Sequence, residues 1–324
     1  MRVLIVHAHH EPRSFNGALT ERAVRTLREA GHEVEVSDLY AMGFDPVSDR
    51  RNFTGVKDPA YLKQQVEEMH ATATNGFAAD IADELAKVER CDALIFQFPL
   101  WWFGPPAILK GWVDRVFAAG RAYGGGRWFE RGAFAGKRAM VAMTTGGPPT
   151  MFNGYGLDPT LETILRPIQH GIFWFTGFDP LPPFIAYAPA RATAEEREAM
   201  LEAYARRVER IFDEPPIRYV RLDECDESFR QRLPRFMVHW RWIEPASGEV
   251  TSARLDELVA EERSMLRELA REGVLLERSI AADECEGWLL LRAKDRSDLE
   301  RRLDALPLRR WLDCIVTELK ADPL

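Results

Sequence analysis

The sequence has few of the features that mark secreted, metal-binding or membrane-spanning chains. Its four cysteines are scattered and form no C-x-x-C pair, so they signal neither a disulfide framework nor a zinc knot. Scattered cysteines suit a reducing compartment, and we expect the protein to be cytoplasmic. The first apolar run, VLIV, is too short for a signal peptide or a membrane span. We therefore expect no membrane insertion.

The chain also has fewer positively than negatively charged side chains. The 43 Lys and Arg residues are outnumbered by 51 Asp and Glu residues, which leaves a net charge of −8. Proteins that bind nucleic acids carry a basic surface, so we expect no nucleic-acid partner. What the chain does have is length and apolar material. Its 324 residues are 46% hydrophobic, which is enough for two domains with their own cores.

The first ~210 residues alternate short apolar runs with helical stretches. Buried strands that alternate with helices predict a parallel sheet covered on both faces. We favour the flavodoxin-like doubly wound α/β fold, whose ligands bind beyond the carboxyl ends of the strands. Irregular residues 40–90 form an insertion that is partly helical. The predicted strands are 2–6, 33–39, 92–98, 137–145 and 184–188, and the predicted helices are 16–30, 105–118, 159–170 and 194–212.

This alternation ends at the Pro215–Pro216 pair, which stops the preceding helix. The elements that follow come in the order βαββαβ, which is typical of a smaller α+β domain with a ferredoxin-like fold. We therefore expect a first domain at 1–215, a linker at 216–234 and a second domain at 235–324. The predicted strands of this domain are 235–242, 274–280, 287–293 and 311–319, and its helices are 251–273 and 295–306.

Unusual residues follow the first predicted strand, in the segment HAHHEPRSFNGAL. It lacks the G-x-G-x-x-G fingerprint, so a dinucleotide-binding turn is not supported. His9, Arg13, Ser14 and Asn16 stand where the next helix begins, and free N–H groups at a helix start can bind an anion. Arg13 would add charge for a phosphate. Simple capping of the helix by Ser14 or Asn16 explains the segment equally well.

The loops after the next two central strands are also unusual. PLWWFGPP places Trp101, Trp102 and Phe103 in a loop, and TTGGPPT (144–150) offers hydroxyls and glycines that let a flat ligand approach the backbone. Together with a helix start that can bind a phosphate, these loops predict a flavin site. In this site the aromatic rings exclude water and stack on a planar substrate. Core packing or a dimer contact is the alternative role of the three aromatic rings.

Several ordered motifs in residues 1–215 resemble the NAD(P)H:quinone oxidoreductases of the DT-diaphorase type: AHHEPRSFNGAL, SDLYAMGFDPVSDRRNFTG, IFQFPLWWFGPPAILKGWVDRVF, TTGG and RPIQHGIFWFTGF. The resemblance implies a flavodoxin-like fold and one tightly bound FAD per subunit. It implies a homodimer with active sites at the subunit interface. It also implies two-electron, ping-pong reduction of quinones by NADH or NADPH.

Carried over by position, the resemblance assigns one residue to the substrate pocket and a larger set to the cofactor. Tyr123 matches a tyrosine that lines the pocket, and Arg197 matches an arginine near the adenine. Arg13 and Trp101 join the cofactor set on the loop argument alone. The other predicted cofactor contacts are His9, Ser14, Phe15, Asn16, Pro99, Leu100, Trp102, Phe103, Thr144, Thr145, Gly146 and Gly147.

The sequence departs from the family at two places. A tyrosine and a histidine that stabilise the reduced flavin in family members are replaced by Phe152 and Asp158. Phenylalanine has no hydroxyl, so Tyr155 and Asp158 become the candidates for that role. One family branch holds a structural zinc with two histidines. Here the second histidine position is Trp174, and because His170 alone cannot hold a metal, we predict none.

The second domain resembles muconolactone isomerase-like and YciI-like ferredoxin-fold modules, on AEERSMLRELAREG (260–273) and LPLRRWLDCIVTELKADP (306–323). The resemblance implies a module that pairs through its sheet, so a higher oligomer could form through it. Glu262 matches a histidine position of YciI-like members and could be a general base, or simply a solvated helix residue. His239 and Trp240 could line the same cleft or pack within the strand.

Three functions remain open from the sequence. The first is an FAD-dependent NAD(P)H:quinone oxidoreductase, in which FMN in place of FAD is an alternative. The second is a redox-sensing ancillary subunit whose second domain binds a partner, since AYGGGRW resembles ancillary subunits of glutathione-gated potassium efflux systems. The third is a catabolic enzyme with a quinone reductase and a lactone isomerase. For the second domain we favour a structural or assembly role.

Overall fold

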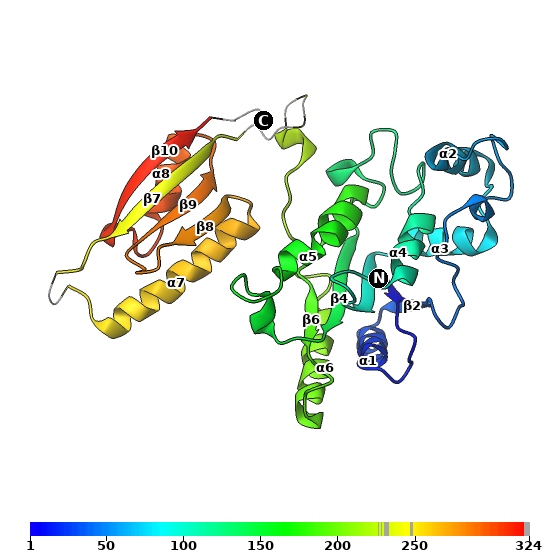
Figure 1. The fold of residues 1–324 in the computed structure, drawn as a ribbon, viewed down its shortest axis with the longest axis horizontal. Helices are drawn as coiled ribbons and strands as arrows, with labels where there is room; N and C mark the ends of the chain where they lie inside the picture. The colour runs from blue at the N-terminus through cyan, green and yellow to red at the C-terminus, as the bar shows by residue number, and fades with distance from the viewer. Residues whose placement is uncertain (226, 228, 230–232, 247–248, 321–324) are drawn as a thin grey trace. The chain divides into compact units, whose positions relative to one another are not determined.

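A computed structural model describes residues 1–225, 227, 229, 233–246 and 249–320 (Figure 1). The chain divides into two compact units, Met1–Pro216 and Ile217–Leu324, called here the N-terminal unit and the C-terminal unit. Each has a core of its own. Within the described ranges, no helix combines the length and the apolar character that crossing a membrane requires.

The N-terminal unit is built on a parallel sheet with the strand order β2-β1-β3-β4-β5, in which β6 also pairs with β4. The flavodoxin-like fold predicted from the sequence is confirmed. β3 is buried along its whole length, as a central strand covered on both faces must be. The strands are β1 (Arg2–His7), β2 (Glu33–Asp38), β3 (Ala93–Pro99), β4 (Arg138–Thr145), β5 (Asp179–Pro180) and β6 (Phe184–Tyr187).

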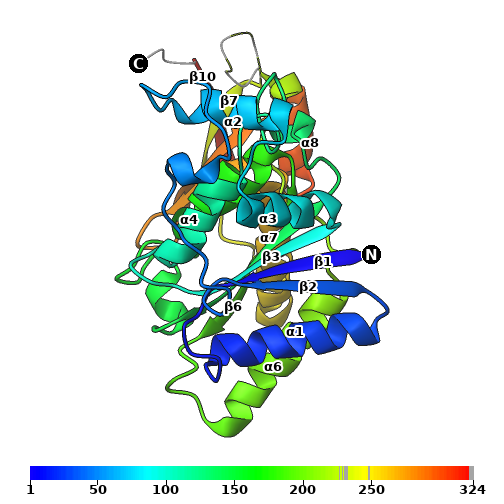
Figure 2. The same cartoon turned by 90° about the vertical axis from the view of Figure 1, so that its right-hand side faces the viewer.

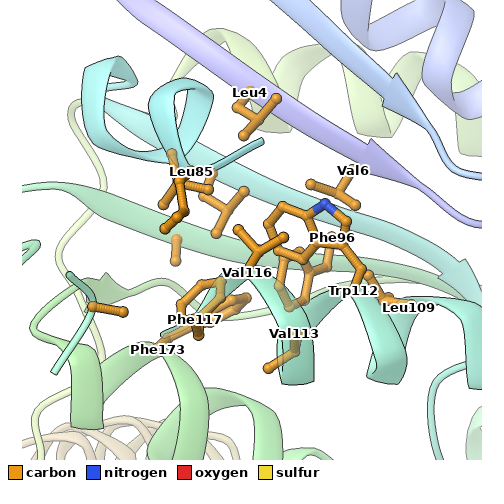
Figure 3. Packing of buried hydrophobic residues seen from close by; sticks show 14 of the residues in the cluster. Leu4, Val6, Leu85, Phe96, Leu109, Trp112, Val113, Val116, Phe117 and Phe173 are labelled. Atoms are coloured by element: carbon orange, nitrogen blue, oxygen red, sulfur yellow. The ribbon is translucent and has the colours of Figure 1, made fainter. Parts of the chain in front are cut away.

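Helices cover both faces of this sheet. α1 (Phe15–Glu29) and α6 (Ala194–Glu209) lie side by side on one face, where Leu19 and Tyr204 are among the residues of their core (Figure 2). Phe96 of β3 and Trp112 of α4 belong to the core on the other face (Figure 3). The helices of that core and of the insertion are α2 (Gln64–Thr74), α3 (Ala79–Arg90), α4 (Ala107–Val116) and α5 (Leu161–Ile168).

Two elements of the N-terminal unit differ from the sequence prediction. The helix predicted over 159–170 begins at Leu161, after Thr160 caps it, and continues past Ile168 as a π-helix, η4 (Gln169–Trp174). Pro167 lies inside this run and has no N–H to donate, which disturbs the regular α-helical hydrogen bonds there. Strand β5 was not predicted, because two residues are too short for an alternation pattern to show.

The C-terminal unit has an antiparallel sheet with the strand order β10-β7-β9-β8. Its chain order is βαββαβ, so the predicted ferredoxin-like fold is confirmed. Both helices lie on one face of the sheet, and Phe236 and Leu299 are among the residues of the core between them. The elements are β7 (Arg235–Trp242), α7 (Ser252–Arg271), β8 (Leu275–Ile280), β9 (Glu286–Arg292), α8 (Arg296–Asp304) and β10 (Leu312–Leu319).

Short 3-10 turns complete the described chain. Most lie in loops between the larger elements, and one of them follows the glycine-rich segment after β4 directly. They are η1 (Arg50–Asn52), η2 (Phe129–Arg131), η3 (Pro149–Phe152), η5 (Leu222–Glu224) and η6 (Arg309–Trp311).

Candidate functional site

Side-chain hydrogen bonds in the N-terminal unit join β3 and β4 to the start of α1. The Gln97 amide on β3 donates to Oδ1 of Asn16 at 2.9 Å, and the Asn16 amide donates to the Thr144 hydroxyl of β4 at 2.9 Å. The backbone N–H of Leu100 donates to the Thr144 carbonyl at 2.8 Å. The loops after β1, β3 and β4 therefore meet at the carboxyl edge of the sheet, where ligands of this fold class bind.

The loop after β1 closes tightly on the start of α1. The Ser14 hydroxyl caps this helix by accepting from the N–H of Gly17 at 3.1 Å. A Cβ atom on Gly17 would lie 2.0 Å from the Pro12 carbonyl oxygen, so only glycine lets the loop pass this close. Because helix geometry provides no partner within the helix for the first N–H groups, those of Phe15 and Asn16 remain for a ligand or for water. Capping and anion binding are thus compatible here.

The charged and imidazole groups of this loop are arranged around Glu11. Nδ1 of His9 accepts from the N–H of Glu11 at 3.0 Å, so a neutral His9 carries its proton on Nε2. Burial, followed by the nearby His10, lowers the pKa of His9. Arg13 is almost fully exposed and lies 3.4 Å from the Glu11 carboxylate. The loop can offer an anion a neutral imidazole donor and one exposed guanidinium.

The aromatic loop after β3 is a tight two-residue turn. Trp101 and Gly104 exchange both backbone hydrogen bonds at 3.0 Å, and Trp102 and Phe103 between them have left-handed φ angles of 51° and 57°. Such angles cost a non-glycine residue roughly 1–2 kcal/mol each. Trp102 is 99% exposed and Phe103 50% exposed, so core packing is wrong as an explanation of these two rings.

Trp101 is placed differently from its two neighbours. Its ring lies 6.1 Å from the ring of His9 and 5.8 Å from that of His10, and His10 in turn lies 5.9 Å from the ring of Tyr40. The aromatic loop is thereby in contact with the loop between β1 and α1. These contacts hold the base of the turn and leave Trp102 and Phe103 free to cover a ligand.

The glycine-rich loop after β4 presents open backbone. The Thr145 hydroxyl donates to the Gly147 carbonyl at 2.8 Å and keeps the loop against the strand. A Cβ atom on the exposed Gly146 would meet no atom within 4 Å, whereas one on Gly147 would meet the Met151 sulfur at 2.4 Å. Gly146 therefore lies beside space in which a flat ring can rest on the backbone.

A residue that the sequence analysis missed stands beside this loop. Tyr187 ends β6 opposite Thr145, and its ring centre is 6.3 Å from that of Phe152. Burial raises the pKa of the Tyr187 hydroxyl. The residue could have been found from its position at the carboxyl end of a predicted strand, which is the signal that identified the other three loops.

The proposed replacements for the family's tyrosine and histidine lie on an exposed segment. Tyr155 is 97% exposed, and its backbone N–H is held by the Asn153 side chain at 3.0 Å. Asp158 donates its N–H to the Met151 carbonyl at 3.1 Å, and Phe152 is buried. Within one subunit, Tyr155 therefore faces solvent, and the roles of Tyr155 and Asp158 stay predictions.

Tyr123 lies away from the three loops, in the wall of a cavity of about 700 Å³. The buried Glu68 of α2 lines the same cavity, together with Gln64 and Gln65. The cavity is the size of a small-molecule site. Among the described residues, none of the predicted cofactor residues lines it. The full lining is Ser48, Lys63, Gln64, Gln65, Glu68, Val113, Asp114, Phe117, Tyr123, Gly171, Ile172, Phe175 and Thr176.

Two further sequence predictions concern single side chains. Arg197, near the start of α6, donates to the Ala192 carbonyl, so one of its N–H groups is used within its own turn. His170 lies in η4 with its ring 5.8 Å from that of Phe129, and Trp174 is buried. In the part of the chain that the structure describes, no three His, Cys, Asp or Glu side chains are grouped as metal ligands.

The C-terminal unit has a much smaller cavity, of about 20 Å³, beside Glu262. The buried Glu262 carboxylate accepts from the N–H of Leu308 at 2.8 Å, and burial raises its pKa. It is therefore not a solvated helix residue. Trp240 lines this cavity with Arg278 and Cys314.

Of the two roles left open for His239 and Trp240, packing within the strand fits the structure and a shared cleft does not. Successive strand residues point to opposite faces of a sheet, and Trp240 faces the helices. On the other face, the His239 ring stacks on Trp288 with centres 5.0 Å apart, and its Nε2 lies 2.9 Å from Glu286.

The carboxyl edge of the N-terminal sheet fits a flavin nucleotide. The start of α1 offers N–H groups for a phosphate, Gly146 offers open backbone for a flat ring, and Trp102 and Phe103 offer exposed aromatic surface. Thr144 and Asn16 hold these parts in register through the hydrogen bond between their side chains.

Comparison with known proteins agrees with both halves of the fold. Residues 1–210 match a family described as flavodoxin-like fold, and residues 236–323 match muconolactone delta-isomerase. The chain is 44% identical over 217 residues to ribosyldihydronicotinamide dehydrogenase [quinone] of Pongo abelii, covering 67% of this chain and 94% of that protein. It is 42% identical over 230 residues to NAD(P)H dehydrogenase [quinone] 1 of Cavia porcellus, covering 71% and 84%.

Among solved structures, a putative quinone reductase from Klebsiella pneumoniae is similar with a TM-score of 0.69 and 39% identity. The match covers 72% of this chain and 94% of that one. These matches leave about the last third of the present chain outside them. The C-terminal unit is thus an addition to the part that these proteins share.

Proposed function

The chain belongs to the family with the flavodoxin-like fold, and from this premise we propose that it is an FAD-dependent NAD(P)H:quinone oxidoreductase. It transfers two electrons as hydride to quinones or similar flat electrophiles, by a ping-pong mechanism. The observation that carries the proposal is the bridge Gln97–Asn16–Thr144, which joins β3 and β4 near their carboxyl ends to the start of α1. The names of the quinone-reducing relatives supply the substrate class.

The side chains at the sheet edge have separate tasks in this proposal. The free N–H groups of Phe15 and Asn16, with His9 and Arg13, bind phosphate. Thr144, Thr145, Gly146 and Gly147 border the flat ring, and the exposed rings of the aromatic loop cover it and exclude water. When bound, the flavin supplies the hydride chemistry, and the protein holds and orients it.

We propose that two copies of the N-terminal unit complete each active site. Trp102 is exposed on a turn that costs conformational energy, which is expected where the ring meets a ligand or a second subunit. Tyr123, assigned to the substrate pocket, lies in a cavity that the cofactor loops of its own chain do not line. A second copy would bring its Tyr123 cavity over these loops.

Absorption and mass measurements on the purified protein test the cofactor. The protein should be yellow, release FAD on denaturation and oxidise NADH or NADPH when menadione is the acceptor. Release of FMN instead would correct the cofactor and keep the reaction. A colourless protein that gains no activity with added FAD would refute the proposal.

A glycine substitution gives a local test of the ring position. Gly146→Leu places a side chain in the space assigned to the flavin, and we expect flavin affinity to fall at least about tenfold, equal to about 1.4 kcal/mol. Gly55→Leu is the matched control, since an added Cβ there also meets nothing within 4 Å. Equal flavin affinity of both variants would contradict the assignment.

For the C-terminal unit we propose a role in assembly. The alternative is a second activity, which its match to muconolactone delta-isomerase suggests. The cavity beside Glu262 has about 20 Å³, room for a single water molecule, and small-molecule sites have about 300–1,000 Å³. A chain ending at Pro216 should keep quinone reduction and form a smaller oligomer. Loss of a lactone-isomerising activity from the full chain on this truncation would favour the two-enzyme alternative.

The regulatory alternative and the cellular location have their own tests. Little turnover with any quinone, together with recovery of a specific partner through the C-terminal unit, would favour a redox-sensing subunit. The four cysteines, all free of disulfides, support the cytoplasmic location expected from the sequence. Fractionation of the cells that make the protein would check it.

A further inference from the structure

Glu68 is a buried carboxyl group in the wall of the 700 Å³ cavity, and no Lys, Arg or His of the described residues forms a salt bridge with it. It is 3% exposed, and its oxygens accept from the N–H of Ala119 at 2.7 Å and the amide of Gln64 at 2.8 Å. The Tyr123 hydroxyl interacts with this carboxyl group, and both residues line the cavity. A carboxyl group that is held by neutral donors beside an open cavity is poorly placed for a purely structural task.

The net effect of the surroundings of Glu68 is to raise its pKa above the usual value of a carboxyl group. Burial raises its pKa, while the hydrogen bonds from Ala119, Gln64 and Tyr123 act in the opposite direction. Burial and then the nearby Glu68 charge raise the pKa of Tyr123. The other charged groups on the cavity wall are Lys63 of α2 and Asp114 of α4, and Asp114 is paired with Lys110 at 2.6 Å. The residues that η4 contributes to the wall, Gly171 and Ile172, carry no charge.

Tyr123 connects Glu68 to the cavity. Its hydroxyl accepts weakly from the Gln65 amide at 3.4 Å, and its ring lies 5.8 Å from the ring of Phe175, which is also part of the wall. A planar acceptor can rest among Phe117, Ile172 and Phe175 within reach of this hydroxyl. The cavity thus has apolar residues in its wall, and Tyr123 interacts there with both Gln65 and Glu68.

We propose that Glu68 supplies the proton that a quinone takes up on reduction, acting through the Tyr123 hydroxyl in this cavity. The proposal rests on the proposed quinone reductase function. Under it, Tyr123 touches the acceptor and is catalytic, whereas Glu68 is a proton-supplying and positioning residue behind it. Neither Tyr155 nor Asp158 is needed for this step.

In this step the quinone takes up one hydride and one proton. Protonated Glu68 donates to the Tyr123 oxygen, so the phenolic hydrogen points into the cavity. The quinone gains the hydride that originates from NAD(P)H, and its carbonyl oxygen forms a new O–H bond with the Tyr123 proton. Tyr123 takes the Glu68 proton, and the carboxylate that remains is held by Ala119 and Gln64 until water reprotonates it. NAD(P)H is oxidised and the quinone becomes a hydroquinone.

The test compares Glu68→Gln with Glu67→Gln in the full-length holoenzyme. Both residues are buried carboxylates of α2, but Glu67 accepts from the backbone N–H groups of Lys57 and Asp58 and is not part of the cavity wall. Each variant is assayed from pH 5 to 9 with menadione, which takes up protons on reduction, and with ferricyanide, which takes up electrons only. Flavin content reports whether each variant is folded.

We expect Glu68→Gln to reduce menadione at least about tenfold more slowly, to lose the wild-type pH dependence, and to reduce ferricyanide within twofold of the wild type. Tyr123→Phe should show the same pattern, and the double variant should be no slower than either single one. Glu67→Gln should match the wild type with both acceptors.

Several results would overturn the proposal. One is a wild-type rate and pH profile of Glu68→Gln with menadione. Another is an equal loss with both acceptors at normal flavin content, because a purely structural role would affect both. A wild-type protein that reduces no quinone would instead refute the proposed function, so the two failures are distinguishable.

Discussion

The two units each bury a glutamate beside a cavity, and the two sites differ in the space next to the carboxyl group. Glu68 of the N-terminal unit faces about 700 Å³, and Glu262 of the C-terminal unit faces about 20 Å³. Burial raises the pKa of both carboxyl groups. The comparison teaches that a shifted pKa alone does not separate a reactive carboxyl group from a structural one.

The two carboxyl groups also differ in the groups with which they interact. Glu68 interacts with Tyr123, and both residues line the large cavity, where we propose that a proton passes from one to the other. Glu262 accepts a backbone N–H from Leu308 and thereby fastens the chain after α8 to α7. The first arrangement can act on a ligand, and the second stabilises a fold.

The largest expected effect comes from filling the first cavity. Gly171 lines it, and an added Cβ there meets no atom within 4 Å, so Gly171→Phe adds bulk without a clash at Cβ. We expect kcat/KM for menadione to fall at least about 30-fold, equal to about 2 kcal/mol, with an unchanged melting temperature. Gly171→Ala should remain close to the wild type. Normal kcat/KM in the phenylalanine variant would show that the acceptor binds elsewhere.

Filling the second cavity should affect stability rather than activity. Cys314 lines a space for one water molecule, so Cys314→Phe overpacks the core and should destabilise the C-terminal unit by about 1–3 kcal/mol. The measurement is hydrogen exchange of α7 amides in the full chain, with menadione reduction as a second readout. Ile315→Phe is the control, since Ile315 is 56% exposed. Lower quinone reduction without faster hydrogen exchange of α7 would contradict the structural role of this cavity.

The smallest expected effect is on pH dependence in the C-terminal unit. Because the folded pKa of Glu262 is raised, wild-type stability falls as the pH rises from the unfolded value of about 4.3 toward the folded one. Glu262→Gln does not ionise and can still accept from Leu308. Relative to the wild type, it should gain stability in α7 as the pH rises from 4 to 8, measured by hydrogen exchange.

This pH effect has a control variant, and one outcome would contradict it. Glu261→Gln, at a helix position where the carboxylate lies 3.1 Å from Arg254 in solvent, should show no such gain. A Glu262→Gln variant that becomes less stable than the wild type with rising pH would mean that the charged carboxylate is preferred in the fold.

Much of the fold could be predicted from local patterns. β7 has the predicted bounds 235–242, and most other strands differ by one residue, because apolar runs and strand alternation are local properties. β5 and η4 could not be predicted this way. The first has two residues, and the second depends on how Pro167 and its neighbours fit against the core.

The candidate site was predictable in part for the same reason. Asn16, Thr144 and Trp102 were found because they follow strands, and all carboxyl ends of a parallel sheet lie at one edge. Glu68 escaped because a glutamate in a helical insertion looks like a solvated residue, and only packing shows that it is buried. Two roles stayed open for His239 because a choice between them requires knowing which face of β7 the helices cover.

By itself, the sequence determined the two fold classes, the strand ends that carry the cofactor loops, and the family to which the first 210 residues belong. These follow from periodicity and from residue types at fixed spacings. Only the tertiary structure decided which of the two buried glutamates has room for a ligand. That depends on side chains from α2, α4 and η4 that are distant along the chain, and cavity volume has no local signature in a sequence.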